Sequence, residues 1–339
     1  MTASMPGGTV AADPDIVPDT GPQVGFEAGE LLLPARPKAL GYVRLSKARV
    51  YHYVYGWALG ALLLWTDGGA DAGSVPALVF VLAGTLAAQW SASAADDVSG
   101  FLDGSDARNY AGRPAVTVVR KPLVTGALTV AEARRFAVVT WSAGMAAVVL
   151  AAAVMPGPVA WPALVVGLVT PALGIQYSWG AKLSYRPLGL EATIFLTGVY
   201  TVVMPYWLAA GTVSRQLLLV AALFGLWLLM VVCYGNASDR AGDRAVGRRT
   251  LAVLLPPPWF TALLHLLVLA NLGLTVLLFT TAHRNPALIV LAVPVLLLHL
   301  VQLYFGTYRG QLRTARFLVL LSIDVGVFGL AAALLLDRA

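Results

Sequence analysis

Residues 236–250 form a group of polar side chains that lies between two strongly apolar segments of the chain. It contains the amide Asn236, the carboxylates Asp239 and Asp243, and the arginines Arg240, Arg244, Arg248 and Arg249. The two aspartates are four residues apart, so a helix would present both carboxylates on one face. Carboxylate oxygens bind divalent metal ions, and guanidinium groups bind phosphate oxygens. The spacing therefore predicts a site for a divalent metal ion that carries a phosphate group.

A second charged group lies earlier in the chain, at residues 96–126. It contains the carboxylates Asp96, Asp97, Asp103 and Asp106 and the basic residues Arg120 and Lys121. If the preceding apolar segment continues as a helix, Asp96 and Asp103 share a face two turns apart. A leaving diphosphate gains charge, which metal ions and basic side chains stabilise. The two groups together therefore favour a diphosphate bound through Mg²⁺.

The elements that must position these groups are helices in a membrane. Hydrophobic residues make up 58% of the 339-residue chain and charged residues 12%, whereas soluble domains carry about 25% charged residues. The mean hydropathy is +0.76. The apolar runs are long and do not alternate with polar residues, which favours helices over a closed barrel. We therefore expect an all-α polytopic membrane protein that binds no nucleic acid.

Nine apolar segments come close to the length of about 20 residues that crosses a bilayer. They are residues 50–65, 75–95, 133–154, 161–178, 191–209, 216–235, 259–280, 286–304 and 317–336. The first is rich in Tyr and Trp, which are typical of the membrane interface. The sequence thus predicts nine transmembrane helices in a bundle around a central cavity.

The basic residues orient this bundle. With a cytoplasmic N-terminus and nine crossings, 20 of the 23 Lys and Arg residues lie in cytoplasmic segments, and only Arg215, Arg284 and Arg338 lie outside. This asymmetry agrees with the positive-inside rule. It predicts an external C-terminus and places both charged groups at the cytoplasmic face, with the active site opening to the cytoplasm.

The N-terminal segment has a different composition. Residues 1–38 are rich in Pro, Gly and Asp and lack the apolar core of a signal peptide. They are expected to form a disordered cytoplasmic tail, followed by one transmembrane domain at residues 39–339. The single cysteine, Cys233, lies in an apolar segment, which indicates a packing role rather than a nucleophile.

Some charged residues have a structural interpretation beside the functional one. Membrane lipids and topology account for Arg134, Arg135, Arg309, Arg313 and Arg316. Asp324 lies within the last span, where a carboxylate either has a function or pairs with a neighbouring helix. Glu191 begins the fifth span, either as a helix N-terminal anchor or as an acid in the cavity.

The charged group at residues 236–250 resembles a known motif. The pattern Asn236…Asp239…Asp243…Gly247…Arg249-Thr250 resembles the second aspartate-rich motif of the UbiA family of intramembrane prenyltransferases. The group at residues 96–126 resembles the family's first motif and the Pro-Leu-containing segment after it. Residues 44–47 resemble the basic start of the family's first helix. The resemblance covers about residues 40–336, and residues 104–106 and 177–191 are most similar to the 1,4-dihydroxy-2-naphthoate branch.

The resemblance implies a role for each matching residue. The expected metal ligands are Asp96, Asp97, Asp103, Asp106, Asp239 and Asp243. The expected ligands of the diphosphate are Asn236, Arg120, Lys121, Lys182, Arg240 and Lys47. The expected catalytic residues are Asp97, Asp239, Asp243 and Glu191, of which Asp97 or Glu191 would accept the proton of an acceptor. The implied cofactor is Mg²⁺, and the implied substrate is an isoprenyl diphosphate.

One position departs from the family pattern. The first motif of the family usually opens with Asn-Asp and has another Asp three residues later, whereas this chain has Asp96-Asp97 followed by Gly100. Asp103 is expected to compensate one turn further along. The departure leaves the metal geometry and the outcome of the reaction open.

Three functions are compatible with these residues. The first is Mg²⁺-dependent transfer of a prenyl group to an aromatic, quinone-precursor-like acceptor in a bacterial-type cell membrane. The second is cyclisation of the prenyl cation without an acceptor, which an apolar cavity with aromatic faces would support. The third is a transporter or lipid-binding membrane protein, which is disfavoured because the charges gather on one side. Prenyl length and acceptor are left undetermined.

Overall fold

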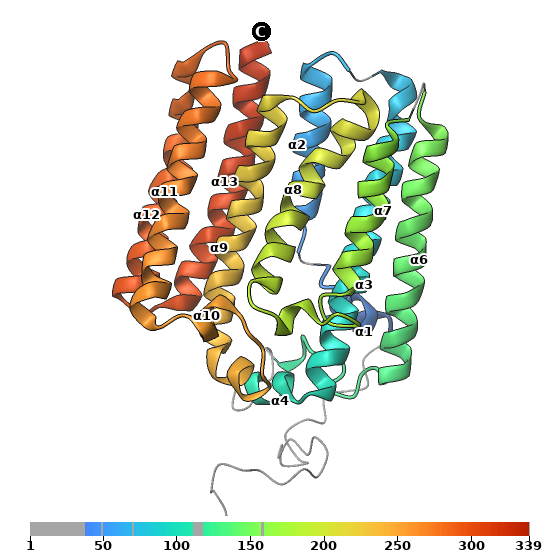
Figure 1. Ribbon diagram of the computed structural model, residues 1–339, viewed down its shortest axis with the longest axis vertical. Helices are drawn as coiled ribbons and strands as arrows, with labels where there is room; N and C mark the ends of the chain where they lie inside the picture. Colours follow the sequence, from blue (N-terminus) through green and yellow to red (C-terminus); the bar gives the residue numbers. More distant parts are fainter. Residues whose placement is uncertain (1–37, 49, 70, 111–117, 157–158, 339) are drawn as a thin grey trace, which may run out of the picture.

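The chain forms a bundle of helices that lie side by side along one direction (Figure 1). The computed structural model describes residues 38–338 except 49, 70, 111–117 and 157–158. Within these residues every regular element is helical, which confirms the all-α prediction. The predicted tail at residues 1–38 lies outside the described part of the chain, apart from Lys38.

The helices follow one another along the chain in the following order. Those near the start of the chain are α1 (Lys38–Leu45), α2 (His52–Thr66), η1 (Ala72–Ser74), α3 (Val75–Leu102), α4 (Ser105–Tyr110) and α6 (Val130–Val154). Those in the middle are α7 (Trp161–Ile175), η2 (Leu183–Tyr185), α8 (Gly189–Ala210), α9 (Arg215–Ala245) and α10 (Leu251–Leu254). The last are α11 (Pro257–Thr281), η3 (Pro286–Ala292), α12 (Val293–Leu303), η4 (Tyr304–Tyr308) and α13 (Leu312–Arg338).

All nine segments predicted as membrane spans form helices. Within the described residues, seven stretches are long and apolar enough to cross a membrane. The chain is therefore an integral membrane protein. Helices α2 and α7 have 15 residues each, fewer than the about 20 that a bilayer requires. Crossing by these two helices, and with it the count of nine, stays a prediction.

Helix α9 supplies much of the core. In its most apolar window 72% of the residues are buried, a larger share than in any of the other six candidate spans of the described chain. Phe224, Trp227 and Tyr234 of α9 are among the largest fully buried side chains. The indole Nε1 of Trp227 donates a hydrogen bond to Asn271 Oδ1 in α11 at 2.7 Å, which satisfies the indole N–H inside the bundle.

Close helix packing brings the first segment of the chain to the functional site. A Cβ on Gly60 of α2 would overlap the carbonyl oxygen of Val202 in α8, and a Cβ on Gly56 would overlap the Thr201 side chain. The two glycines therefore allow α2 to approach α8 more closely than residues with side chains could. This contact holds the segment before α2, which contains Lys47, against the bundle.

Two long helices carry the charged groups. Helix α3 has 28 residues and α9 has 31. At 1.5 Å per residue, α9 is roughly 46 Å long, which exceeds the roughly 30 Å of a hydrocarbon core. Asp96 and Asp97 lie in the last two turns of α3, and Asp239 and Asp243 lie in the last two turns of α9. These ends, with α4 and α10, gather at the end of the bundle opposite the C-terminus (Figure 1).

Candidate functional site

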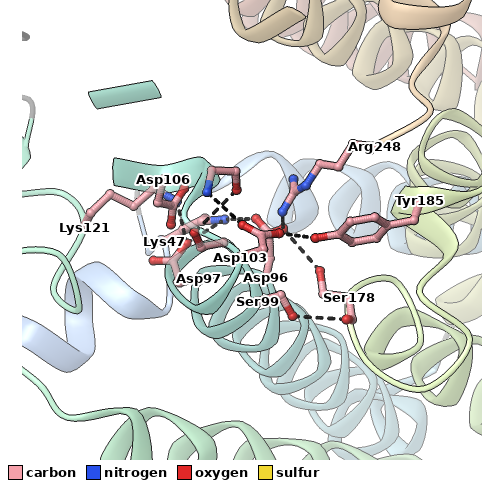
Figure 2. A network of polar contacts seen from close by, with 12 residues as sticks. Lys47, Asp96, Asp97, Ser99, Asp103, Asp106, Lys121, Ser178, Tyr185 and Arg248 are labelled. Carbon is pink, nitrogen blue, oxygen red and sulfur yellow. Dashed lines mark hydrogen bonds and ion pairs between the residues drawn. The ribbon is translucent and has the colours of Figure 1, made fainter. Parts of the chain in front are cut away.

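Asp96 and Asp97 meet two lysines near the end of α3 (Figure 2). Lys47 Nζ lies 3.1 Å from Asp96 Oδ2 and 3.4 Å from Asp97 Oδ1. Lys121 Nζ lies 2.9 Å from the same Asp97 oxygen. The Asp97 side chain is only 1% exposed, and a carboxylate buried to this extent requires opposite charges beside it. The two ammonium groups supply them.

Lys121 joins the end of α3 to α4. Its Nζ also lies 2.8 Å from Asp106 Oδ1. Burial acts to lower the pKa of Lys121, but the adjacent Asp97 and Asp106 carboxylates raise it well above its usual value, so this lysine is charged at neutral pH. Burial raises the pKa of Asp106 to about 6, although Lys121 opposes the shift. Lys121 is thus the shared partner of two carboxylates from different helices.

Gly100 explains how Asp106 reaches this cluster. Helix α3 ends at Leu102, and Gly104 (φ +75°) turns the chain into α4, a conformation that glycine adopts without strain. The turn places the Asp106 carboxyl group directly over Gly100, where an added Cβ would lie 2.9 Å from both Asp106 Cγ and Asp106 Oδ2. Asp106 therefore occupies the space that a side chain at position 100 would fill, and whether Asp103 or Asp106 compensates for the missing acid stays a prediction.

Arg248 connects the second charged group to the first. Its Nη2 atom lies 3.5 Å from Asp96 Oδ1, and its guanidinium carbon lies 5.6 Å from the centroid of the Tyr185 ring. The Tyr185 hydroxyl donates a hydrogen bond to Asp103, and Ser178 Oγ donates one to Asp96 Oδ1 at 3.2 Å. Figure 2 shows Arg248 and Tyr185 converging on the end of α3 from outside it. Residues distant in the chain thus form one network.

The predicted residues of α9 lie near this network, because Asp243 interacts electrostatically with Arg248, Asp96 and Asp103. Asp243 is buried, and burial raises its pKa to about 6, although Arg248 acts to lower it. Asn236 Nδ2 donates a hydrogen bond to Glu191 Oε1 at 3.3 Å. The same Glu191 oxygen accepts one from the backbone N–H of Leu251 at 2.8 Å. Glu191 therefore ties α8 to α9 and α10, and its predicted catalytic role stays a prediction. Asp239 is half-buried one turn before Asp243.

Three basic residues predicted for the diphosphate site take no part in the ion pairs of the cluster. Arg120 is exposed. Lys182 Nζ lies 5.5 Å from the Tyr185 ring centroid, and the Arg240 guanidinium carbon lies 5.6 Å from the Phe260 ring centroid. Within the described residues, none of the three forms an ion pair with a carboxylate of the cluster. Their predicted role in binding a diphosphate stays a prediction.

The side chains of the network are better suited to binding an anion together with its metal ion than to binding a metal ion alone. Within the described part of the chain, no three carboxylate, histidine or cysteine side chains are grouped as a ready metal site. The carboxylates bind lysines and an arginine instead. One buried oxygen, Asp97 Oδ2, has no hydrogen-bond partner among the described residues, and oxygen is the donor that Mg²⁺ prefers. The donor set therefore fits a hard divalent cation that arrives with its anionic ligand.

Sequence reasoning missed two residues of the network as site residues. By sequence, Arg248 is one of four arginines in its segment, of which Arg240 is the predicted ligand of the anion. Ser178 belongs only to the segment at residues 177–191 that carries part of the family resemblance. The signal that favours Arg248 is Gly247 with φ +75°, which ends α9 and turns the following residue back toward α3. No sequence signal pairs Ser178 with Asp96.

A cavity of about 150 Å³ adjoins the network inside the bundle. Asp96 and Lys47 form its charged wall. The rest of the lining comes from α2, α3, α7, α8 and the segment after α7, and it includes three tyrosine side chains, those of Tyr53, Tyr177 and Tyr200. The Tyr200 hydroxyl donates a hydrogen bond to the Gly167 carbonyl oxygen at 3.3 Å. The region therefore combines a charged wall with a pocket of helix side chains.

Comparison with known proteins identifies the family. The sequence model of the UbiA prenyltransferase family matches residues 54–323. The chain belongs to this family. The match contains both charged groups and every residue of the cavity lining except Lys47 and Tyr53. It also contains all the predicted spans except the start of the first, residues 50–53, and most of the last, residues 324–336. Comparison with curated proteins gave no significant match.

Solved structures with the UbiA fold agree with the architecture. A UbiA homolog from Aeropyrum pernix K1 in its apo form is 16% identical and has a TM-score of 0.63, over 85% of this chain and 98% of that one. A UbiA homolog from Archaeoglobus fulgidus bound to DMAPP and Mg²⁺ is 16% identical, with a TM-score of 0.57 over 86% and 99%. A digeranylgeranylglyceryl phosphate synthase is 12% identical, with a TM-score of 0.59 over 88% and 98%. At these identities the similarity shows the fold.

Proposed function

We propose that this UbiA-family protein transfers a prenyl group from an isoprenyl diphosphate to an aromatic, quinone-precursor-like acceptor within the membrane. The main support for this proposal is that Asp96 and Lys47 belong both to the ion-pair network and to the lining of the cavity. An anionic head group with an apolar tail requires such a combination of surfaces. The Archaeoglobus fulgidus homologs bound to Mg²⁺ with DMAPP or GPP support a prenyl diphosphate as the ligand.

The residues of the network would divide their roles as substrate binds. Mg²⁺, when bound, supplies Lewis-acid stabilisation of the departing diphosphate. Asp97 and Asp106 from one side and Asp239 and Asp243 from the other would hold it. Their present partners, above all Lys121, would then turn to the phosphate oxygens, because an ammonium group binds phosphate as readily as carboxylate. The Asp103 oxygens both accept hydrogen bonds already, from Tyr185 and from the Ser105 backbone N–H, so we assign Asp103 to support of the site.

The membrane topology and the branch of the family are inferred from the basic residues and from the resemblance. We infer nine crossings with a cytoplasmic N-terminus, an external C-terminus and a site that opens to the cytoplasm of a bacterial-type cell, because this arrangement accounts for the basic residues. Residues 1–38 would form a tail and residues 39–339 the catalytic domain. The resemblance at residues 104–106 and 177–191 supports the dihydroxynaphthoate branch.

Product analysis tests the proposed reaction. Purified protein should consume both an isoprenyl diphosphate and 1,4-dihydroxy-2-naphthoate, and release diphosphate in equal amount. A series of prenyl lengths would define the chain that the cavity accepts. Diphosphate release without consumption of the acceptor would contradict the transferase.

A terpene cyclase is the second candidate. Tyr53, Tyr177 and Tyr200 in the cavity lining favour it, because aromatic faces stabilise carbocations. The same incubation without an acceptor distinguishes it, since a cyclase would convert the prenyl diphosphate into a cyclic hydrocarbon or alcohol. A transporter or lipid-binding protein, the third alternative, would release no diphosphate under either condition.

Mg²⁺ with inorganic diphosphate should stabilise the folded protein. A ligand that binds only the folded state at about a hundred times its Kd adds about 2.7 kcal/mol. We expect the thermal midpoint of the detergent-solubilised protein to rise with Mg²⁺ and diphosphate together, and this rise to disappear in the double variant Asp239→Asn, Asp243→Asn. The control Asp71→Asn changes an exposed aspartate that caps η1 and should keep the full response. An equal rise in the double variant would remove these two residues from the site.

A further inference from the structure

A second cavity lies beyond the site described above. It has a volume of about 570 Å³ and is lined by the end of α3, the first turns of α6 and the segment after α7. It shares no lining residue with the cavity beside the ion-pair network. Ser178 separates the two, because its hydroxyl donates to Asp96 while its carbonyl oxygen accepts a hydrogen bond from Ser99 at 3.1 Å. The second cavity is therefore a distinct feature of the bundle.

The position of this cavity follows from helix lengths. Helix α7 ends at Ile175 after 15 residues, whereas its neighbour α6 has 25 residues and α3 has 28. At 1.5 Å per residue, α7 is about 15 Å shorter than α6. The connecting segment rather than a helix therefore covers this part of α3 and α6. It contributes Trp179 and Tyr185 to the lining, and both residue types are typical of the membrane interface.

The lining has the two kinds of surface that an amphiphile requires. Its apolar part includes Leu102 and Val138, which are 58% and 51% exposed and face outward from a membrane bundle. Its basic part is Arg134 and Lys182, both exposed. Within the described residues neither forms an ion pair with a carboxylate. The cavity thus presents two available positive charges next to apolar side chains.

The one acidic side chain in the lining does not cancel these charges. Asp103 accepts hydrogen bonds on both oxygens, from the Tyr185 hydroxyl and from the Ser105 backbone N–H at 2.8 Å. Both of its oxygens are thus occupied by groups of the wall. Lys182 adopts a left-handed backbone conformation with φ +47°, which is costly for a lysine and is retained where the surrounding structure demands it. With two basic side chains and one carboxylate, the lining keeps an excess of positive charge, which favours an anion.

We propose that the second cavity binds an anionic membrane phospholipid. Its phosphate would lie between Arg134 and Lys182, and an acyl chain would lie along Leu102 and Val138. Basic pockets between transmembrane helices at the membrane surface bind anionic lipid head groups in this way. The bound lipid would hold the segment that carries Ser178 and Tyr185 in place. It would thereby stabilise the hydrogen bonds that these two residues donate to Asp96 and Asp103. The inference does not depend on which reaction the protein catalyses.

Native mass spectrometry of the purified full chain tests the lipid site. We expect one phosphatidylglycerol molecule to stay bound under conditions that remove phosphatidylcholine with the same acyl chains. Arg134→Gln and Lys182→Asn should each weaken phosphatidylglycerol binding about fivefold, and the double variant should weaken it by more than tenfold, because each basic residue contributes separately to the attraction. Asparagine is chosen at 182 because it tolerates a positive φ.

Arg135→Gln is the matched control, since it removes the same charge from the adjacent, exposed residue that does not line the cavity. It should leave the lipid affinity within twofold of the original chain. Equal retention of the two lipids, or equal losses for Arg134→Gln and Arg135→Gln, would overturn the proposal. Displacement of phosphatidylglycerol by millimolar inorganic phosphate would also overturn it, because the site would then recognise a free anion rather than a lipid. Unchanged thermal unfolding of each variant shows that the fold is intact.

Discussion

Asp97→Asn is expected to lower the turnover of an isoprenyl diphosphate by about 100-fold or more. The substitution keeps the shape of the side chain but removes a charge that is 1% exposed and lies within 3.4 Å of both Lys47 and Lys121. A lost electrostatic contact at a preorganised site costs about 100- to 1,000-fold in rate. The initial rate of diphosphate release at saturating Mg²⁺ and substrate measures the effect.

Stability must be measured beside the rate, because removing one partner of a buried ion pair costs up to about 3–5 kcal/mol. Asp71→Asn is the matched control, since Asp71 precedes η1 at the opposite end of α3. It should lose stability slightly and keep its turnover. A folded Asp97→Asn protein with at least a tenth of the original turnover would remove Asp97 from the catalytic residues.

Gly100→Ala is expected to reduce turnover by at least about tenfold, although alanine is the better helix former. The new Cβ would lie 2.9 Å from Asp106 Cγ, and no native structure keeps such a contact. Asp106 must therefore move away from Lys121 Nζ, which it now approaches to 2.8 Å. Gly100→Asp, which restores the acid of the usual family motif, should be worse, because it places a second carboxylate against Asp106.

Gly273→Ala in α11 controls for the change of residue type, because an added Cβ there would contact nothing within 4 Å. It should keep full turnover and gain up to about 1 kcal/mol of stability. The double variant Gly100→Asp, Asp106→Gly would exchange the two positions. Recovery of turnover in this variant would show that one carboxylate in that space is what the reaction requires. Full activity of Gly100→Ala would show that the position of Asp106 is not critical.

The network also accounts for the unusual first motif. The opening Asp96-Asp97 pair supplies two negative charges where the usual motif has one, and Lys47, Lys121 and Arg248 surround them. Asp106 of α4 lies over Gly100, because the Gly104 turn brings α4 back over α3. The space that a side chain at position 100 would fill therefore holds a carboxylate from a later position in the chain.

The sequence alone determined the class of protein and the chemistry of the site. Apolar runs near the length of a bilayer require helices, because lipid offers no partner to an unsatisfied backbone group. The four-residue spacing of Asp239 and Asp243 predicts a shared helix face, and both lie in the last two turns of α9. The resemblance to the UbiA family was confirmed by the match over residues 54–323. These inferences depend on composition and local spacing, which need no knowledge of neighbouring helices.

Only the tertiary structure decided which charges meet. Lys47 and Asp96 are 49 residues apart in the chain, and Arg248 and Asp96 are 152 apart. Helical periodicity fixes the direction of a side chain about its own helix axis, but the rotation and depth of each helix depend on packing, as at Gly60 and Val202. For this reason Arg248 rather than Arg240 joined the network, and Lys182 came to line a separate cavity. Asp106 came to lie over Gly100 because the turn at Gly104 folds α4 back over α3.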